Sequence, residues 1–101
     1  MFGKTNRNSL EPPLLAGDKS AQEILRVWVA PEWAQMQVAL LTHHSDPAVW
    51  GVALVDIARH VAKAYELAGS LSENDALSRI RQVFDAEWSA PTDLPEGKLR
   101  E

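Results

Sequence analysis

The segment from Pro47 to Gly69 predicts a helix whose apolar surface is too wide for one neighbour to cover. Ser45 or Asp46 can cap its first amides, and Pro47 suits the first turn. Gly69 is a typical residue at a helix end. At about 100° per residue, apolar side chains fill roughly 200° of the circumference, about twice the stripe of an ordinary surface helix. They are Trp50, Gly51, Ala53, Leu54, Val55, Ile57, Ala58, Val61, Ala62, Ala64 and Tyr65. Such a helix needs two neighbours.

The start of this helix carries two further valines that one small core does not explain. Val49 and Val52 fall in the sector that otherwise holds charged side chains, namely Asp56, Arg59, Lys63 and Glu66. Apolar residues in a sector expected to face water indicate contact with another molecule. We therefore expect Val49 and Val52 to lie on an interaction surface. At the opposite edge, Gly51, Ala58 and Ala62 form a thin strip where a neighbouring backbone could approach closely.

Before this helix, the stretch "EILRVWVAPEWAQMQVALLTH" predicts a β-hairpin. It is rich in valine and tryptophan, and Pro31 suits the second position of a turn. With a loop over 31–34, three cross-strand pairs form one apolar face: Leu25 with Leu40, Val27 with Val38, and Val29 with Met36. The opposite face is mixed and holds Ile24, Arg26, Trp28, Gln37, Ala39 and Leu41.

A helix is the alternative for the first half of this stretch. Ser20 followed by Glu23 resembles a capping box, which could start a helix through "ILRVWV". The density of valine and tryptophan favours the strand over that helix.

A second helix is expected to begin at Ser72, with Asp75 three residues later as in a capping box. An amphipathic stripe then recurs at helical spacing and consists of Leu77, Ile80, Phe84 and Trp88, widened by Ala76 and Val83. We expect this stripe to cover one side of the first helix. Trp50 and Trp88 are both expected in the core.

The order of these elements predicts an α+β fold, a β-hairpin followed by two α-helices (ββαα). We expect a disordered N-terminal arm over 1–20, the folded domain over 21–90 and a flexible C-terminal tail over 91–101. A core of roughly 70 residues is marginal in stability, and the 101-residue chain has no cysteine to crosslink it. A lone hairpin also has open edges. We therefore expect a homodimer, in which two hairpins pair into a four-stranded sheet.

Composition limits the partners and the location of the protein. The net charge of -4 argues against nucleic acid as a partner. The sequence has no run of about 18 apolar residues and no signal-peptide pattern, so we expect a cytoplasmic protein with no membrane contact. No phosphate-cradling loop, zinc spacing or nucleophile motif appears, and we expect no cofactor and no metal.

Three motifs, "LRVWVAP", "DPAVWGVALVDIARHVAKAYE" and "RIRQVFDAEWSAPTD", resemble a family of short bacterial proteins known only as a domain of unknown function. The resemblance spans 24–93. It implies an α+β fold and no established activity, so it assigns no catalytic residue. In the turn it implies a glycine or another small residue, where this chain has Glu32 and Trp33.

The candidate interaction residues are Arg26, Trp28, Trp33, Val49 and Val52. An exposed aromatic beside an arginine can bind a partner protein or stacked bases. The acidic balance favours protein. We expect a small interaction or regulatory module of the cytoplasm without catalytic activity, with an unidentified protein partner. The alternative is a ligand- or nucleic-acid-binding regulator that uses the Arg26 and Trp28 face.

Two polar groups could carry chemistry but favour a structural interpretation. Asp56 and His60 stand one helical turn apart, with Arg59 as a possible anion clamp, yet no loop of the sequence forms a cleft around them. His43 and His44 are adjacent, so at a strand end they point to opposite sides and cannot readily share one metal ion. We expect neither group to be a catalytic or metal site.

Overall fold

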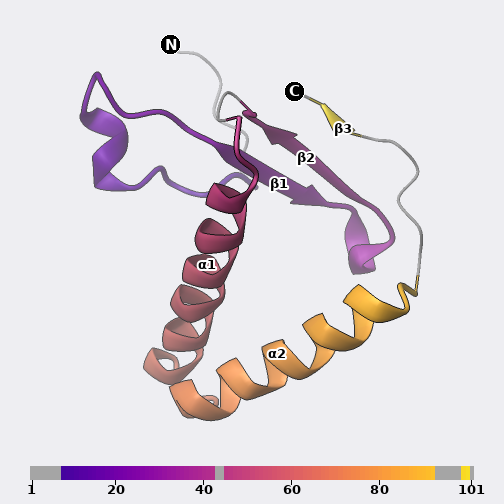
Figure 1. Ribbon diagram of the computed structural model, residues 1–101. Coiled ribbons are helices and arrows are strands. Elements are labelled where there is room, and N and C mark those ends of the chain that lie inside the picture. The colour runs from indigo at the N-terminus through magenta and orange to yellow at the C-terminus, as the bar shows by residue number, and fades with distance from the viewer. Residues whose placement is uncertain (1–7, 43–44, 93–98, 101) are drawn as a thin grey trace. The chain divides into compact units, whose positions relative to one another are not determined.

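The computed structural model describes residues 8–42, 45–92 and 99–100 (Figure 1). Its elements are a short 3-10 helix at Leu14–Gly17, β1 at Leu25–Val29, a 3-10 turn at Pro31–Trp33, β2 at Met36–Leu40, α1 at Ala48–Leu67, α2 at Glu73–Ser89 and β3 at Leu99–Arg100. The predicted hairpin followed by two helices is confirmed. The chain divides into two compact units, one built on the hairpin and one on the helix pair.

The hairpin has the register that the sequence predicts. β1 and β2 are antiparallel, and Leu25, Val27 and Val29 lie opposite Leu40, Val38 and Met36 in turn. The Ala30 amide donates to the Gln35 carbonyl (2.8 Å) and closes the loop over 31–34. Pro31 takes the second turn position, since the Trp33 amide donates to the Ala30 carbonyl (2.9 Å). The alternative helix through this stretch is wrong.

A third strand lies in the segment predicted to be a tail. Leu99–Arg100 pairs in parallel with β2, so the sheet order is β1-β2-β3. A two-residue strand leaves no periodic pattern, and its pairing depends on a distant segment, so sequence reading missed it. Within the described residues, β1 and β3 are then the two edge strands of the sheet.

The hairpin turn holds two bulky residues in the left-handed region. Glu32 has φ 59° and Trp33 has φ 58°. This region is disfavoured for L-residues because the Cβ atom crowds the backbone. The family resemblance implied a small residue here, and the backbone shows the physical reason for that preference.

Glu32→Gly is expected to raise the free energy of unfolding by about 0.5–1 kcal/mol, because relief of the left-handed conformation exceeds the added chain entropy of glycine. Chemical denaturation measures the change. The matched control is Ala34→Gly in the same loop, where φ is -63° and the same entropy cost lowers stability. Equal destabilisation by both substitutions would contradict this prediction.

Both ends of α1 are fixed by the residues that the sequence singled out. An Asp46 carboxylate oxygen accepts from the Ala48 amide (2.9 Å). At the other end Gly69 has φ 82°, its amide donates to the Glu66 carbonyl (2.9 Å), and the Ser70 amide donates to the Tyr65 carbonyl (3.1 Å). This pair of bonds is a Schellman motif, which ends the helix at a left-handed glycine.

α2 starts at the predicted cap and is tied to the end of α1. The Ser72 hydroxyl oxygen accepts from the Asp75 amide (3.1 Å). A Glu66 carboxylate oxygen accepts from the Glu73 amide (3.1 Å), and the Lys63 ammonium lies 3.9 Å from Glu66 and 3.6 Å from Glu73. The connection between the helices is therefore held by polar contacts as well as by packing.

The two helices contact each other close to this connection and diverge beyond it (Figure 1). Ala62 of α1 and Ala76 of α2 are the buried residues among those described, at 0% and 3% exposure. Ala58 is half-buried, so the predicted thin strip is the contact strip at Ala58 and Ala62. Gly51, in the same strip, has open space around it.

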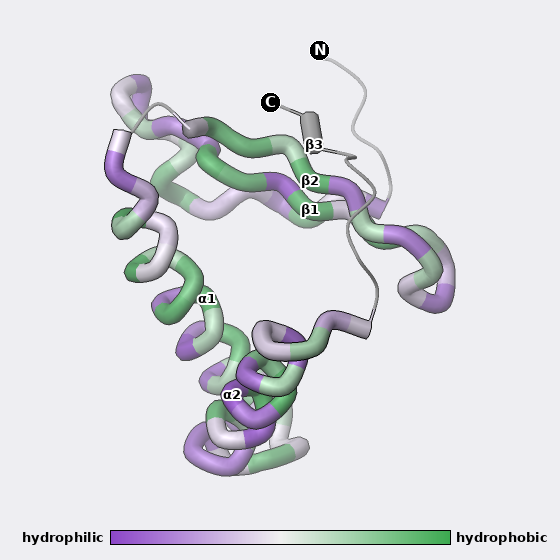
Figure 2. Tube along the Cα trace, turned by 45° about the vertical axis from the view of Figure 1, so that its right-hand side comes forward, coloured by the Kyte–Doolittle hydropathy of each residue, from purple (hydrophilic) through white to green (hydrophobic). Residues whose placement is uncertain are grey.

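Neither of the two tryptophans expected in the core is fully buried. Trp50 is half-buried, whereas Trp88 is 78% exposed, so the prediction for Trp88 is wrong within the single chain. The stripe of α2 continues past the point where α1 diverges, and its last members lose their neighbour. Figure 2 shows hydrophobic residues along both strands and along α1.

Candidate interaction surfaces

The first candidate surface, here called the hairpin surface, consists of Arg26, Trp28 and Trp33. Arg26 and Trp28 lie on the same face of β1, two residues apart. Trp28 is partly exposed and Trp33, in the turn, is 73% exposed. An exposed tryptophan can bind a partner at a low cost in conformational entropy, because its side chain has only two rotatable bonds.

Arg26 is engaged within the chain. Its guanidinium donates to both carboxylate oxygens of Glu23, with the closest pair of atoms 2.9 Å apart. The two charges offset each other, so the hairpin surface offers two indole rings with little net charge. Such a surface attracts phosphate weakly and suits a protein partner better.

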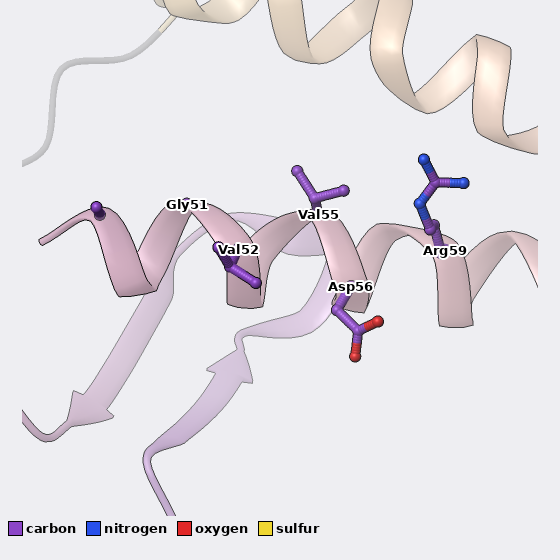
Figure 3. A pocket seen from close by; sticks show the side chains of 6 residues that line it. Gly51, Val52, Val55, Asp56 and Arg59 are labelled. Carbon is purple, nitrogen blue, oxygen red and sulfur yellow. The ribbon is translucent and has the colours of Figure 1, made fainter.

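The second candidate surface is an open hollow of about 540 Å³ beside the N-terminal half of α1 (Figure 3). We call it the α1 hollow. Its walls are Ala48, Gly51, Val52, Val55, Asp56 and Arg59. Val52 is 73% exposed, and Val49 is exposed outside the hollow. The two valines that the sequence left unexplained are thus exposed to solvent in the single chain.

An aromatic pair on α2 forms a further exposed apolar patch, which sequence reading missed. The rings of Phe84 and Trp88 stack with centroids 5.7 Å apart and planes inclined by 21°. Both side chains are exposed. Their spacing of four residues is the signal, but it also fits a core stripe, and only the divergence of the helices separates the two interpretations.

Near the end of α2 a polar contact fixes a negative charge. The Thr92 hydroxyl donates to one Glu87 carboxylate oxygen, and the Thr92 amide donates to the other (3.0 Å). These hydrogen bonds, the hydroxyl first, lower the pKa of Glu87. Because the pKa of Glu87 is lower in the folded state, this contact stabilises the fold at pH values above the usual carboxyl pKa. The stabilisation is lost as the pH falls through the lowered pKa of the folded state.

Asp56, Arg59 and His60 do not assemble into a catalytic group. His60 Nδ1 lies 2.8 Å from the Asp56 carbonyl oxygen and 3.6 Å from its carboxylate. Because the carbonyl can only accept, Nδ1 is the donor. Both side chains are exposed, and Figure 3 shows the Arg59 guanidinium and the Asp56 carboxylate extending away from each other.

Metal and membrane interpretations find no support in the described part of the chain. His43 and His44 lie outside the described residues. Over 8–42 and 45–92, no three His, Cys, Asp or Glu residues are grouped so that they could hold a metal ion. The described helices include none with the length and apolar character needed to cross a membrane.

Comparison with known proteins places these features in a family. A family model described as "Domain of unknown function (DUF5076)" matches residues 10–92. No curated protein matches the chain. A solved structure described as "Structure of a putative pyruvate dehydrogenase from the photosynthetic bacterium Rhodopseudomonas palustrus CGA009" is similar, with 36% identity, a TM-score of 0.69 and 100% of each chain covered. This chain therefore belongs to the DUF5076 family, a domain of unknown function.

Proposed function

We propose that this protein is a small cytoplasmic interaction or regulatory module, that it works as a homodimer, and that it has no catalytic activity of its own. The observation that supports this proposal is the balance between buried and exposed apolar side chains. Among the described residues only two alanines are buried, while large apolar side chains are exposed on both units. Exposed apolar surface on this scale is typical of proteins that bind other proteins.

The hairpin surface is the proposed site for a protein partner. Tryptophan and arginine are the residue types most enriched where binding energy concentrates in interfaces. Trp28 and Trp33 are exposed, and the charge of Arg26 on the same face as Trp28 is offset by Glu23. An apolar partner surface would cover both rings at little electrostatic cost.

The experiment uses the full chain as bait, followed by titration of each purified partner. Trp28→Ala combined with Trp33→Ala is expected to weaken binding at least tenfold, since each ring is a large share of the surface. The matched control is Leu67→Ala, which removes a side chain that is 78% exposed on α1 and belongs to neither candidate surface. Unchanged affinity after loss of both hairpin tryptophans would remove the hairpin surface from the proposal.

Salt separates this proposal from a regulator that binds nucleic acid through Arg26 and Trp28. Binding to phosphates weakens steeply as salt rises, whereas an apolar protein contact changes little. We expect no binding of single-stranded or duplex oligonucleotides at 150 mM salt, about physiological ionic strength. Tight, salt-sensitive oligonucleotide binding that is lost in Trp28→Ala would favour the alternative.

The name of the solved relative raises a dehydrogenase as a second candidate function. The purified chain is expected to give no pyruvate-dependent reduction of NAD⁺ above the blank when coenzyme A, thiamine diphosphate and Mg²⁺ are added. Asp56 and His60 are the residues to test if turnover appears, because they form the one imidazole and carboxylate pair within the described residues. Turnover that Asp56→Asn or His60→Ala abolishes would overturn the non-catalytic proposal.

A further inference from the structure

We propose that the open end of the α1 and α2 pair is the contact between two copies of this chain, so that the dimer joins four helices. This inference rests on the homodimer of the proposed function and adds its interface. The occupant of the α1 hollow is the helix pair of the second copy.

The apolar sides of the two helices continue past the place where they touch. Ala62 and Ala76 are the buried residues of the two helices, and about two helical turns further from the connection lie Val55 on α1 and Phe84 on α2. Val55 points to the side of α1 on which α2 lies (Figure 3), yet it is exposed, as is Phe84. Two helices that diverge while staying apolar leave these side chains without a neighbour in the other helix, and in a four-helix bundle such side chains are covered by further helices.

The exposed side chains supply the area that a stable dimer needs. An aromatic side chain buries roughly 150–250 Å² when covered. At 48% and 78% exposure, Phe84 and Trp88 can together lose roughly 200–300 Å² on association. A standard interface buries about 800 Å² per partner. These two rings supply about a quarter to a third of it, and Val49, Val52, Val55 and Val83 add to them.

Gly51 has no function within the single chain. Glycine inside a helix costs about 0.5–1 kcal/mol relative to alanine. A Cβ atom placed on Gly51 would meet nothing within 4 Å, so no contact among the described residues requires glycine. With Ala48 in the same hollow, it lets the backbone of a second helix approach α1 closely.

The charges of the α1 hollow favour a second copy over an unrelated apolar partner. Of the arginines whose side chains are described, Arg59 alone forms no hydrogen bond or ion pair, whereas Arg26, Arg79 and Arg81 each have a partner. Asp56 lies in the same hollow, one turn away. A two-fold interface uses the same patch twice, so a patch with one cation and one anion complements itself.

The test measures the oligomeric state of the full chain by sedimentation over a wide concentration range. Val52→Glu places a carboxylate in the hollow of both copies and is expected to raise the dimer dissociation constant about 100-fold or more. The matched control, Leu67→Glu, adds the same charge to the same helix at 78% exposure, close to the connection. It is expected to leave the dimer intact, although a carboxylate near a helix C-terminus disfavours the helix more than one near the start.

Gly51→Leu is a second test of the same interface, for the case in which Val52→Glu unfolds the chain. Leucine is the better helix former, so circular dichroism is expected to show no loss of helix while the dimer dissociates at least tenfold more readily. A dimer that survives both Val52→Glu and Gly51→Leu but not Val27→Glu would place the interface on the sheet; it would overturn this inference and leave the proposed homodimer standing. A wild-type monomer at every concentration would overturn both.

Discussion

Replacing Trp50 by alanine is expected to lower the free energy of unfolding by about 2–4 kcal/mol. Trp50 is half-buried, whereas the other three tryptophans are exposed. Loss of the ring removes burial worth about 25 cal/mol per Å² and leaves space that the neighbours fill only in part. Against a total stability of about 5–15 kcal/mol, the change is large for a chain of this size.

Denaturant titration at a concentration where the chain is monomeric measures this loss. The matched control is Trp88→Ala, because the same side chain is removed from a position that is 78% exposed. It is expected to change the monomer by no more than about 0.5 kcal/mol. Equal losses in the two variants would mean that Trp50 and Trp88 are buried alike in solution.

Ala62→Leu is expected to cost about 1–3 kcal/mol by forcing α1 and α2 apart. Ala62 has no exposed surface, and the equally small Ala76 is the buried residue of α2. Three added carbon atoms have no space at that point unless the helices separate. The expected signature is a lower midpoint of thermal unfolding together with faster hydrogen exchange along α2.

Ala64→Leu is the matched control, since it makes the same change two residues away on an exposed side of α1. Its effect is expected to lie within about 0.5 kcal/mol of zero, as leucine and alanine are both good helix formers. A harmless Ala62→Leu would show that the helices are not in close contact there.

The features that the sequence predicted well are those that local chemistry decides. The register of β1 and β2 follows from alternation around Pro31, because a one-residue slip would move every apolar side chain to the other face. Asp46, Ser72 and Gly69 fix helix ends through hydrogen bonds within a few residues of themselves. Such signals do not depend on what the rest of the chain does.

The features that the sequence missed depend on the distance between elements. Periodicity places Trp88 on the apolar stripe of α2, but it does not show over what length α1 packs against that stripe. The two helices diverge before Trp88, which is therefore exposed. The expectation of a small residue in the turn also has a local cause, namely the backbone conformation of the turn itself. Glu32 and Trp33 occupy the positions where a small residue was expected, and both have positive φ. Val49 and Val52 are candidates because they break the pattern of the helix, and their role stays a prediction.

The parallel pairing of β3 with β2 has a consequence for the order of folding. The hairpin and the helix pair each join neighbouring segments, so each can form early, with a small entropic cost of loop closure. Val38 and Leu99 instead meet across about 60 residues of chain. Two paired residues stabilise the chain too little to offset the entropy lost in closing so long a loop. We therefore expect this pairing to form only after α1 and α2 have formed and shortened the loop. During synthesis, Leu99 and Arg100 leave the ribosome about 60 residues after the strand with which they pair, and a newly made chain presents an uncovered β2 edge until they do.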